Sequence, residues 1–298
     1  MKSIVPAHAL VALALASTAG TARADDGVEH CTGFVTSLPL QISDDGVWCM
    51  DTDLATAAHA PDYGVRITAG HVVLDCKGHA LRHTDISSSS SGISTLASNR
   101  RVTIRNCRVE GFRTGIWIQA SLTDSPAVAI VEDNVLVDNL NFGIRADGIR
   151  HAQIRRNTVI DAGTRPTVGH ATGILVQVDG DAIVHDNVVA GVAGGDTGSS
   201  WIHSRGINVT AAGHSSVVGN IVSDMLPGTN GAAYGVFFPP GSRATVRDNQ
   251  VTGDGRATTR GIACADSSGV ILVGNTVSGV GRPADKCPGD AGGTYVTP

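Results

Sequence analysis

The sequence is poor in the residues that mark several classes of functional site. Only 4% of the residues are aromatic, there are three methionines, and the 11 histidines are scattered, whereas copper handling calls for clustered Met or His. The chain has no C-x-x-C pair, no H-E-x-x-H motif, no nucleotide-binding loop and no nucleophile elbow. These absences argue against a zinc site, a nucleotide-binding fold and a serine hydrolase.

Charged residues are also sparse, at 16%, and neither sign forms a patch. The formal net charge is −5, which becomes −7 if Lys2 and Arg23 are removed with an N-terminal leader. A mildly acidic chain without a basic patch argues against a nucleic-acid partner. After residue 24 no apolar run approaches the ~20 residues that cross a bilayer. We therefore expect no membrane span. Since no linker interrupts the chain after about residue 60, we expect one domain, and we also expect a monomer.

The first 24 residues, "MKSIVPAHALVALALASTAGTARA", have the features of a secretory signal peptide. Lys2 gives a short basic start, an apolar run follows, and Ala22-Arg23-Ala24 is a small-x-small cleavage pattern. We expect cleavage after Ala24 and a secreted or periplasmic protein; the alternative is a retained anchor, for which the apolar run is short. The remaining chain is divided into a leader or cap (25–60), a repeat region (61–282) and a C-terminal tail (283–298).

Six cysteines, an even number, suit an oxidising compartment. The first two flank the leader segment, the next two fall at similar places in successive repeats, and the last two bracket the end of the repeat region. We favour the disulfides Cys31–Cys49, Cys76–Cys107 and Cys264–Cys287. The alternative is that Cys76 and Cys107 are reduced and fill a core.

A frame of glycine, a branched apolar residue and a later asparagine recurs along the chain. The glycines lie 23 to 33 residues apart, and each is followed by Ile or Val; they are Gly64, Gly92, Gly115, Gly143, Gly173, Gly206, Gly235 and Gly261. In six of seven repeats an asparagine lies 14 residues after the glycine, and in the seventh, which contains "SLTDSP", it lies 19 after. These asparagines are Asn106, Asn134, Asn157, Asn187, Asn220, Asn249 and Asn275.

A period of this length indicates a solenoid. Short β-branched runs with period-2 alternation, separated by Gly, Asn and Asp, predict strands, and the 3.6-residue spacing of helices is missing. Stacked coils pair their strands in parallel about 4.8 Å apart, so equivalent side chains lie over one another. We expect an Ile/Val ladder in the core and an Asn column at a bend, where the amides bond to neighbouring coils.

The segments "HVVLDCKGHAL" and "RVTIRNCRVEGF", with the recurring N-x-V and G-I, resemble the repeats of the pectate-lyase-like superfamily over roughly residues 60–280. The resemblance implies an all-β fold, a single-stranded right-handed parallel β-helix of about eight coils. It also implies that the G-I strands form the first sheet, along which substrate lies in that superfamily. The activity stays open, because the superfamily includes lyases, hydrolases, epimerases and non-catalytic proteins.

Side chains on the outer face of the G-I strands are the candidate binding residues. In G-I-x-V the Ile and Val point inward, so the residues two and four after each glycine point outward. An exposed Trp beside amide and charged groups suits a sugar chain, which it binds by ring stacking and hydrogen bonds. The alternative is that the "SLTDSP" loop covers this Trp. The candidates are Trp117, Gln119, Arg145, Asp147, Gln177 and Asn208, with Trp201 from the longest loop.

Long loops before the middle coils add residues of catalytic types. Elimination from an acidic polysaccharide needs groups that neutralise a uronate carboxylate, remove a proton and protonate the leaving oxygen. The candidates are Arg145, His170, His203, Arg205 and Tyr234. We therefore predict a protein that acts on or binds an acidic polysaccharide, with lyase activity favoured. The alternative is a non-catalytic glycan-binding or surface module.

Other chemistries fit less well. A glycoside hydrolase needs two or three carboxylates on one face, and Asp147 is the only one on the predicted first sheet. An epimerase is also less favoured. The Arg-x-Pro-x-x-Arg pattern of pectate lyases is half present in "RPTVGH", which ends in His170, and the acidic calcium cluster of that group is not evident. We assign no cofactor, Ca²⁺ being the one to consider.

Overall fold

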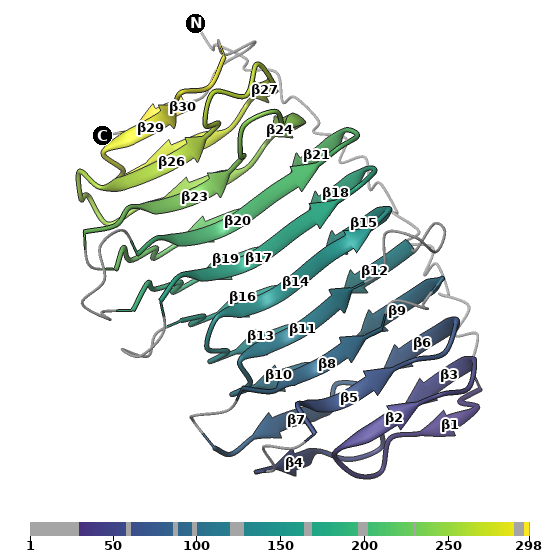
Figure 1. Ribbon diagram of the computed structural model, residues 1–298. Helices are drawn as coiled ribbons and strands as arrows, with labels where there is room; N and C mark the ends of the chain where they lie inside the picture. Colours follow the sequence, from purple (N-terminus) through teal and green to yellow (C-terminus); the bar gives the residue numbers. More distant parts are fainter. Residues whose placement is uncertain are drawn as a thin grey trace, which may run out of the picture. The chain divides into compact units, whose positions relative to one another are not determined.

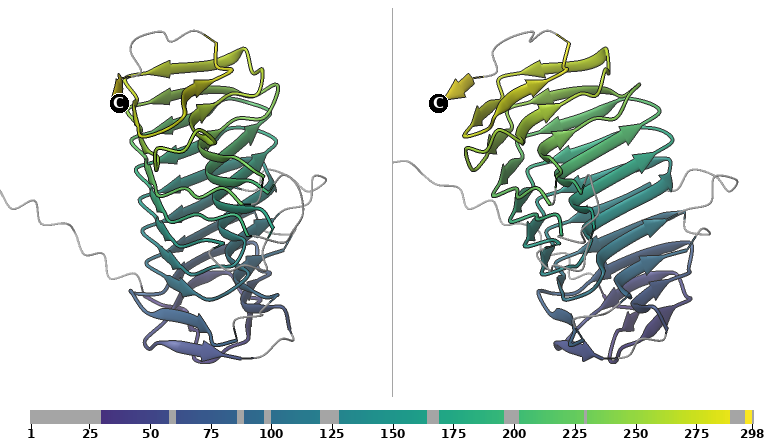
Figure 2. Two further views of the ribbon diagram at one scale, coloured as in Figure 1. Left: turned by 90° about the vertical axis from the view of Figure 1, so that its left-hand side faces the viewer. Right: turned by 60° about the vertical axis from the view of Figure 1, so that its left-hand side comes forward.

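Every regular element in the described part of the chain is a β-strand. The computed structural model describes residues 30–57, 61–85, 89–96, 100–119, 128–163, 169–195, 202–228, 230–288 and 295–297. The strands belong to one unit, Cys31–Pro298, in which the chain winds into successive coils (Figure 1). Each full coil contributes one strand to each of three sheets, seen as stacked arrows in Figure 2.

Each sheet has ten strands, and neighbouring strands pair in parallel. The Gly-Ile sheet contains the repeat glycines: β2 (Leu40–Ile42), β5 (Tyr63–Ile67), β8 (Ser91–Thr95), β11 (Thr114–Gln119), β14 (Phe142–Ile149), β17 (Ala171–Val178), β20 (Ser204–Ala211), β23 (Ala233–Phe237), β26 (Thr259–Ala263) and β29 (Arg282–Asp285).

The other two sheets lie before and after the bend that carries the asparagines. The pre-Asn sheet contains β1 (Gly33–Phe34), β3 (Gly46–Cys49), β6 (His71–Asp75), β9 (Arg101–Arg105), β12 (Val128–Glu132), β15 (His151–Arg155), β18 (Ala182–His185), β21 (Ser215–Val218), β24 (Arg243–Arg247) and β27 (Gly269–Val273). The post-Asn sheet contains β4 (Leu54–Thr56), β7 (Ala80–His83), β10 (Arg108–Glu110), β13 (Val135–Val137), β16 (Thr158–Ile160), β19 (Val188–Ala190), β22 (Ile221–Ser223), β25 (Gln250–Thr252), β28 (Thr276–Ser278) and β30 (Tyr295–Thr297).

The predicted all-β solenoid is confirmed. Eight strands of the Gly-Ile sheet carry the repeat glycines, and β2 and β29 add one strand at either end. The sheets extend beyond residues 61–282 in both directions, because β1 to β4 lie in the predicted leader and β30 in the predicted tail. The three predicted disulfides, Cys31–Cys49, Cys76–Cys107 and Cys264–Cys287, are confirmed. The predicted signal peptide lies outside the described residues.

The core is built by the branched residue that follows each repeat glycine. Ile116, Ile144 and Ile174 are fully buried and lie in register on adjacent strands. The glycine before them has no room for a side chain. A Cβ on Gly143 would lie 2.4 Å from Val159 Cγ1 and 2.7 Å from the carbonyl oxygen of Gly173, so only glycine fits.

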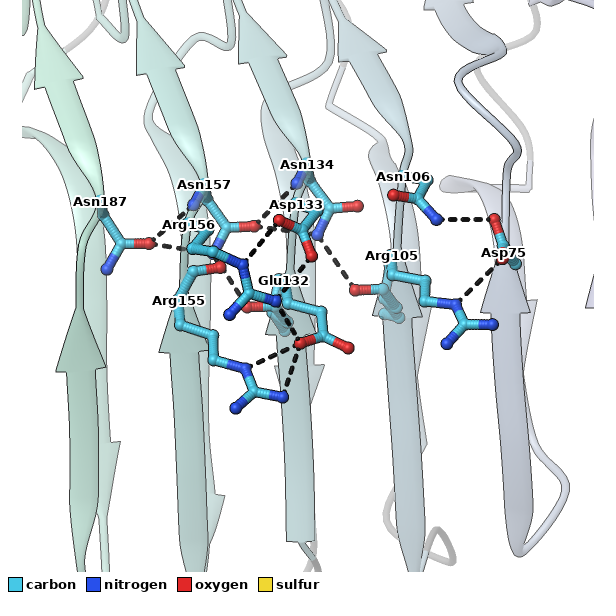
Figure 3. Close-up of polar contacts among 12 residues, drawn as sticks. Asp75, Arg105, Asn106, Glu132, Asp133, Asn134, Arg155, Arg156, Asn157 and Asn187 are labelled. Atoms are coloured by element: carbon cyan, nitrogen blue, oxygen red, sulfur yellow. Dashed lines mark hydrogen bonds and ion pairs between the residues drawn. The ribbon is translucent and has the colours of Figure 1, made fainter. Parts of the chain in front are cut away.

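Buried asparagines form a hydrogen-bonded ladder at the bend between the pre-Asn and post-Asn sheets (Figure 3). Asn157 Nδ2 donates to Asn187 Oδ1 at 3.0 Å, and Asn187 Nδ2 donates to Asn220 Oδ1 at 2.9 Å. The backbone N–H of each donor residue binds the same oxygen. The ladder runs from Asn134 to Asn275. It satisfies donors that would otherwise be buried without a partner.

Asn106, which the repeat spacing places in this column, lies outside it. The strand register aligns Arg105 with Glu132, so Cys107 takes the column position, and its N–H donates to Asn134 Oδ1 at 3.0 Å. Asn106 Nδ2 instead donates to Asp75 Oδ1 at 3.1 Å. The prediction was wrong because the path from the glycine to the end of β9 is one residue longer than the equivalent path to the end of β15.

Candidate functional site

The outer face of the Gly-Ile sheet carries side chains in columns that run across the strands. Register sets these columns, with neighbouring strands roughly 4.8 Å apart. One column contains Trp117, Arg145, Leu175, Asn208 and Phe237, and the next contains Gln119, Asp147, Gln177 and Thr210. The structure therefore places the six predicted strand residues for sugar binding on one face.

Not every position two residues after a repeat glycine is open to solvent. Trp117 and Arg145 are half-buried. By contrast, Ser94, Leu175, Asn208 and Ala263 are buried, with exposed fractions of 8% or less. Facing outward on a strand thus does not by itself expose a side chain.

A groove of about 520 Å³ lies over β11 to β20; we call it the Trp117 groove. Trp117 Nε1 donates to Asp147 Oδ2 at 3.0 Å, and Arg145 Nε donates to the same oxygen. The Arg145 guanidinium carbon lies 5.1 Å from the centroid of the Trp117 ring. These contacts fix the ring in the wall of the groove. The lining is Trp117, Gln119, Arg145, Asp147, Gly148, Gln177, Val178, Asp179 and Thr210.

Several buried polar atoms on this face lack a hydrogen-bond partner. They include Asp147 Oδ1 on β14, and Arg205 Nε, Asn208 Oδ1 and Thr210 Oγ1 on β20. A buried polar atom without a partner costs about 1–3 kcal/mol. Such atoms are rare in folded chains, and an ordered water molecule or an ion is the ordinary partner that completes them.

Two stacked histidines lie at the start of β17 and β20. Their ring centroids are 5.7 Å apart. The N–H of His203 donates to His170 Nδ1 at 2.9 Å, and the N–H of Ala232 donates to His203 Nδ1 at 3.0 Å. Each Nδ1 is therefore an acceptor, which leaves the proton of the neutral ring on Nε2. Burial, followed by the nearby charge of Arg205, lowers the pKa of His203.

Arg205 lies beside these rings with two aromatic neighbours. Its guanidinium carbon is 5.0 Å from the Phe237 centroid and 5.9 Å from the Tyr234 centroid. Burial lowers the pKa of Arg205 from its usual high value. On the far side of Tyr234, the Arg260 guanidinium carbon lies 5.2 Å from the ring. We call His170, His203, Arg205, Tyr234 and Phe237 the Arg205 cluster.

The predicted catalytic residues thus fall into two groups. Arg145 lines the Trp117 groove, while His170, His203, Arg205 and Tyr234 come together in the Arg205 cluster. Trp201 lies outside the described residues, as do the residues of "SLTDSP", so the predicted loop cover of Trp117 stays a prediction.

Sequence reasoning missed two further residues of this face, Phe142 and Arg260. Both directly precede a repeat glycine, as Arg205 and Tyr234 do. The Phe142 centroid lies 5.2 Å from the Arg145 guanidinium carbon, so it shares the outer face with a residue two after the glycine. The position before the glycine was the signal that could have found them.

A larger hollow, of about 580 Å³, lies at the asparagine bend beside Cys107. Its charged lining groups already have partners within the fold. Asp133 pairs with Arg156 at 2.7 Å, as Figure 3 shows, and Lys77 pairs with Asp75 at 3.3 Å. This hollow is thus part of a structural charge network and a weaker candidate than the outer face of the Gly-Ile sheet.

Comparison with known proteins settles the family. A family model described as a right-handed beta helix region matches residues 56–222 and 91–281. The chain belongs to the right-handed β-helix family. No curated protein and no solved structure matches this β-helix chain. Among its described residues, no group of three His, Cys, Asp or Glu side chains could hold a metal ion. The described segments also contain no helix long and apolar enough to span a membrane.

Proposed function

We propose that this β-helix protein binds an acidic polysaccharide along the outer face of the Gly-Ile sheet. The observation that carries the proposal is the Trp117 groove, in which an oriented aromatic ring lies beside amide and charged side chains from neighbouring strands. A polysaccharide presents hydroxyl and carboxylate groups at regular intervals, and it can bind the polar side chains that line the groove on several strands at once. Trp117 lines the groove on β11, and Phe237 on β23 adds a second aromatic ring to the same face.

The groove residues suit a sugar ring. The Trp117 ring is half-buried and oriented by Asp147 and Arg145, so stacking on it costs little further ordering. Gln119 and Gln177 flank Asp147 in the same column and carry amides that both donate and accept. Asp147 and Thr210, two strands apart, are separated by about 10 Å, because strands lie roughly 4.8 Å apart. The ligand therefore crosses the strands, along the solenoid.

The proposal includes export from the cytoplasm. Three disulfides are compatible with an oxidising compartment, where such bonds persist. The N-terminal sequence has the order of a signal peptide, with a basic start, an apolar run and Ala22-Arg23-Ala24. Secreted or periplasmic polysaccharide is the ligand class that this location makes accessible.

Lyase activity is the second candidate function. The observation that favours it is Tyr234, whose ring lies between the guanidinium groups of Arg205 and Arg260. Cations can neutralise a uronate carboxylate, and a phenol can exchange a proton with the reacting sugar. If this candidate holds, Tyr234→Phe abolishes the absorbance of unsaturated product while leaving binding intact.

Titration of the mature protein with polygalacturonate, alginate and glycosaminoglycan fragments tests the proposal. We expect Trp117→Ala to weaken binding about 2- to 10-fold, the size of a lost stacking contact. Ile271→Ala is the matched control, because Ile271 is 47% exposed on the pre-Asn sheet. If no fragment binds, or if both variants change binding equally, the proposal is wrong.

A further inference from the structure

We infer that the Arg205 cluster is a subsite for a carboxylate group of the ligand, and that its two histidines do not supply the base of a reaction. The inference rests on the proposed function, since it assigns one chemical group of the polysaccharide to one part of the face. Three observations carry it: an unpaired guanidinium, the aromatic rings that orient it, and two histidines whose proton position is fixed.

Arg205 has no carboxylate partner in the described part of the chain, whereas two other arginines on this face each form an ion pair. Arg145 pairs with Asp147, and Arg260 pairs with Asp285. Arg205 forms no ion pair with any described residue, and its buried Nε has no hydrogen-bond partner. A guanidinium held partly out of water without an anion is costly, and a bound anion recovers that cost through charge-assisted hydrogen bonds.

The rings of Phe237 and Tyr234 set the shape that the anion must have. Both rings lie within 6 Å of the Arg205 guanidinium carbon, at 5.0 and 5.9 Å, the distance at which cation–π attraction acts. Aromatic contacts of this kind occupy the faces of a guanidinium and leave its edge for hydrogen bonding. Because Nε of Arg205 is itself buried, the edge open to a ligand is the one formed by the two terminal nitrogens, and it matches the two oxygens of a planar carboxylate.

The histidines add donors without adding a base. Because Nδ1 of His170 accepts from His203 N–H, and Nδ1 of His203 accepts from Ala232 N–H, the neutral rings keep their protons on Nε2. A ring nitrogen that carries a proton donates a hydrogen bond but cannot remove a proton from a sugar carbon. The two rings are nearly parallel, with an interplanar angle of 22°, and each Nδ1 accepts from a backbone N–H of the next coil, so both Nε2–H groups point in similar directions. They are fixed donors beside an unpaired cation.

Among the described residues, the groups that face the cluster are positive, neutral or already paired. Arg260 lies on the other side of Tyr234, and Asp285, the nearby carboxylate, binds both Arg260 and Arg282. The ligand must therefore bring the negative charge. A uronate carboxylate supplies it with two oxygens that match two guanidinium nitrogens, and a sulfate ester is the competing anion that the test includes.

The test compares three variants and two forms of one polymer. The polymer is the panel member that wild type binds most tightly, used native and after chemical reduction of its carboxyl groups to hydroxymethyl groups. Dextran sulfate is the sulfated competitor. The variants are Arg205→Gln, Arg205→Lys and the control Arg243→Gln, an exposed arginine on β24 of the pre-Asn sheet. Melting curves check that each variant is folded.

We expect carboxyl reduction and Arg205→Gln each to weaken binding about 10- to 100-fold, the size of a lost charge-assisted hydrogen bond. The affinity of Arg205→Lys should lie between those of wild type and Arg205→Gln, because lysine keeps the positive charge and lacks the planar edge. Arg243→Gln should bind like wild type. Equal binding of native and reduced polymer, unchanged binding by Arg205→Gln, or displacement by dextran sulfate in preference to the native polymer overturns the inference.

A second measurement separates this inference from the proposed function. Free glucuronate and methyl glucoside are titrated while the imidazole and Arg205 Nε–H signals are followed by nitrogen-15 NMR. We expect glucuronate alone to shift the signals of His203 and Arg205, with His203 remaining the Nε2–H tautomer. If glucuronate shifts them but no polymer binds, the subsite stands and the polysaccharide proposal is wrong. If neither sugar shifts them, or His203 proves to carry its proton on Nδ1, the subsite is wrong.

Discussion

At the scale of single residues, the repeat glycine determines which side chains reach the outer face. Regular strand alternation would put the residue before the glycine and the residue two after it on opposite faces of a strand. They share one face here: Arg205 precedes a glycine and stacks on Phe237, which lies two after the next one. Each repeat therefore presents three outward positions where alternation predicts two. The extra position supplies Arg205 and Tyr234 to the site.

A glycine substitution tests this role. Gly143→Ala would place a Cβ 2.4 Å from Val159 Cγ1 and 2.7 Å from a backbone carbonyl oxygen, which cannot move as a side chain can. We expect the free energy of unfolding to fall by about 1–3 kcal/mol, as overpacking does in cores. Gly169→Ala is the control, because a Cβ there meets nothing within 4 Å, and its effect should stay within about 0.5 kcal/mol. Urea titration of both variants measures the difference. Equal free energies of unfolding would contradict the role assigned to the repeat glycine.

The broken alternation also explains which residues of the candidate site could be predicted from the sequence. The columns that begin with Trp117 and Gln119 follow from period-2 alternation after the glycine, and the structure places them on the outer face. The outward position of Phe142 and Arg260 does not follow from this alternation. It depends on the bend at the glycine, a tertiary feature that no local pattern displays. The histidine tautomers depend on backbone donors in the next coil, and no motif encodes those.

At the scale of elements, the asparagine ladder joins one coil to the next independently of the strands. In the middle of the ladder, Asn187 accepts from the backbone and side chain of Asn157 and donates to Ile154 and Asn220. Each rung therefore satisfies buried groups in two neighbouring coils. The repeat period was enough to predict this column and its bend. It failed at Asn106, where one additional residue before β9 shifts the register.

Replacing one asparagine of the ladder should lower the stability of the fold. Asn187→Ala removes the four hydrogen bonds of the Asn187 side chain and leaves the buried backbone N–H of Asn157 without its acceptor, and such a group alone costs about 1–3 kcal/mol. We expect the free energy of unfolding to fall by at least about 3 kcal/mol, measured by urea titration. Asn106→Gly is the control: glycine tolerates the positive φ of 53° at this position, and the change removes the side-chain hydrogen bond to Asp75. A larger loss for Asn106→Gly than for Asn187→Ala would show that Asn106 belongs to the ladder after all.

At the scale of the whole molecule, the disulfides lie toward the two ends of the coil stack. Cys31–Cys49 and Cys76–Cys107 join early coils, and Cys264–Cys287 joins the segments that follow β26 and β29. The middle coils, which carry the candidate site, are held by strand pairing, the core and the asparagine ladder. In a solenoid each coil contacts mainly its neighbours, so an end coil has one partner where a middle coil has two. The disulfides thus stabilise the end coils, which have the fewest contacts. The candidate site lies on the middle coils, which are stabilised by a neighbour on each side.

Hydrogen exchange of a disulfide variant tests this distribution of stability. Replacing both Cys264 and Cys287 by Ala opens a loop with a sequence separation of 23 residues, worth ~3 kcal/mol in the chain-entropy account. Because each coil is stabilised chiefly by its neighbours, we expect faster exchange in β26 and β29 and unchanged protection in β14 and β17, which carry the Trp117 groove. The double variant of Cys31 and Cys49 is the matched control and should loosen β1 and β3 instead. If β14 and β17 lose protection together with β26, the prediction is wrong. The end coils would then be coupled to the middle coils, and the whole stack would unfold as one cooperative unit.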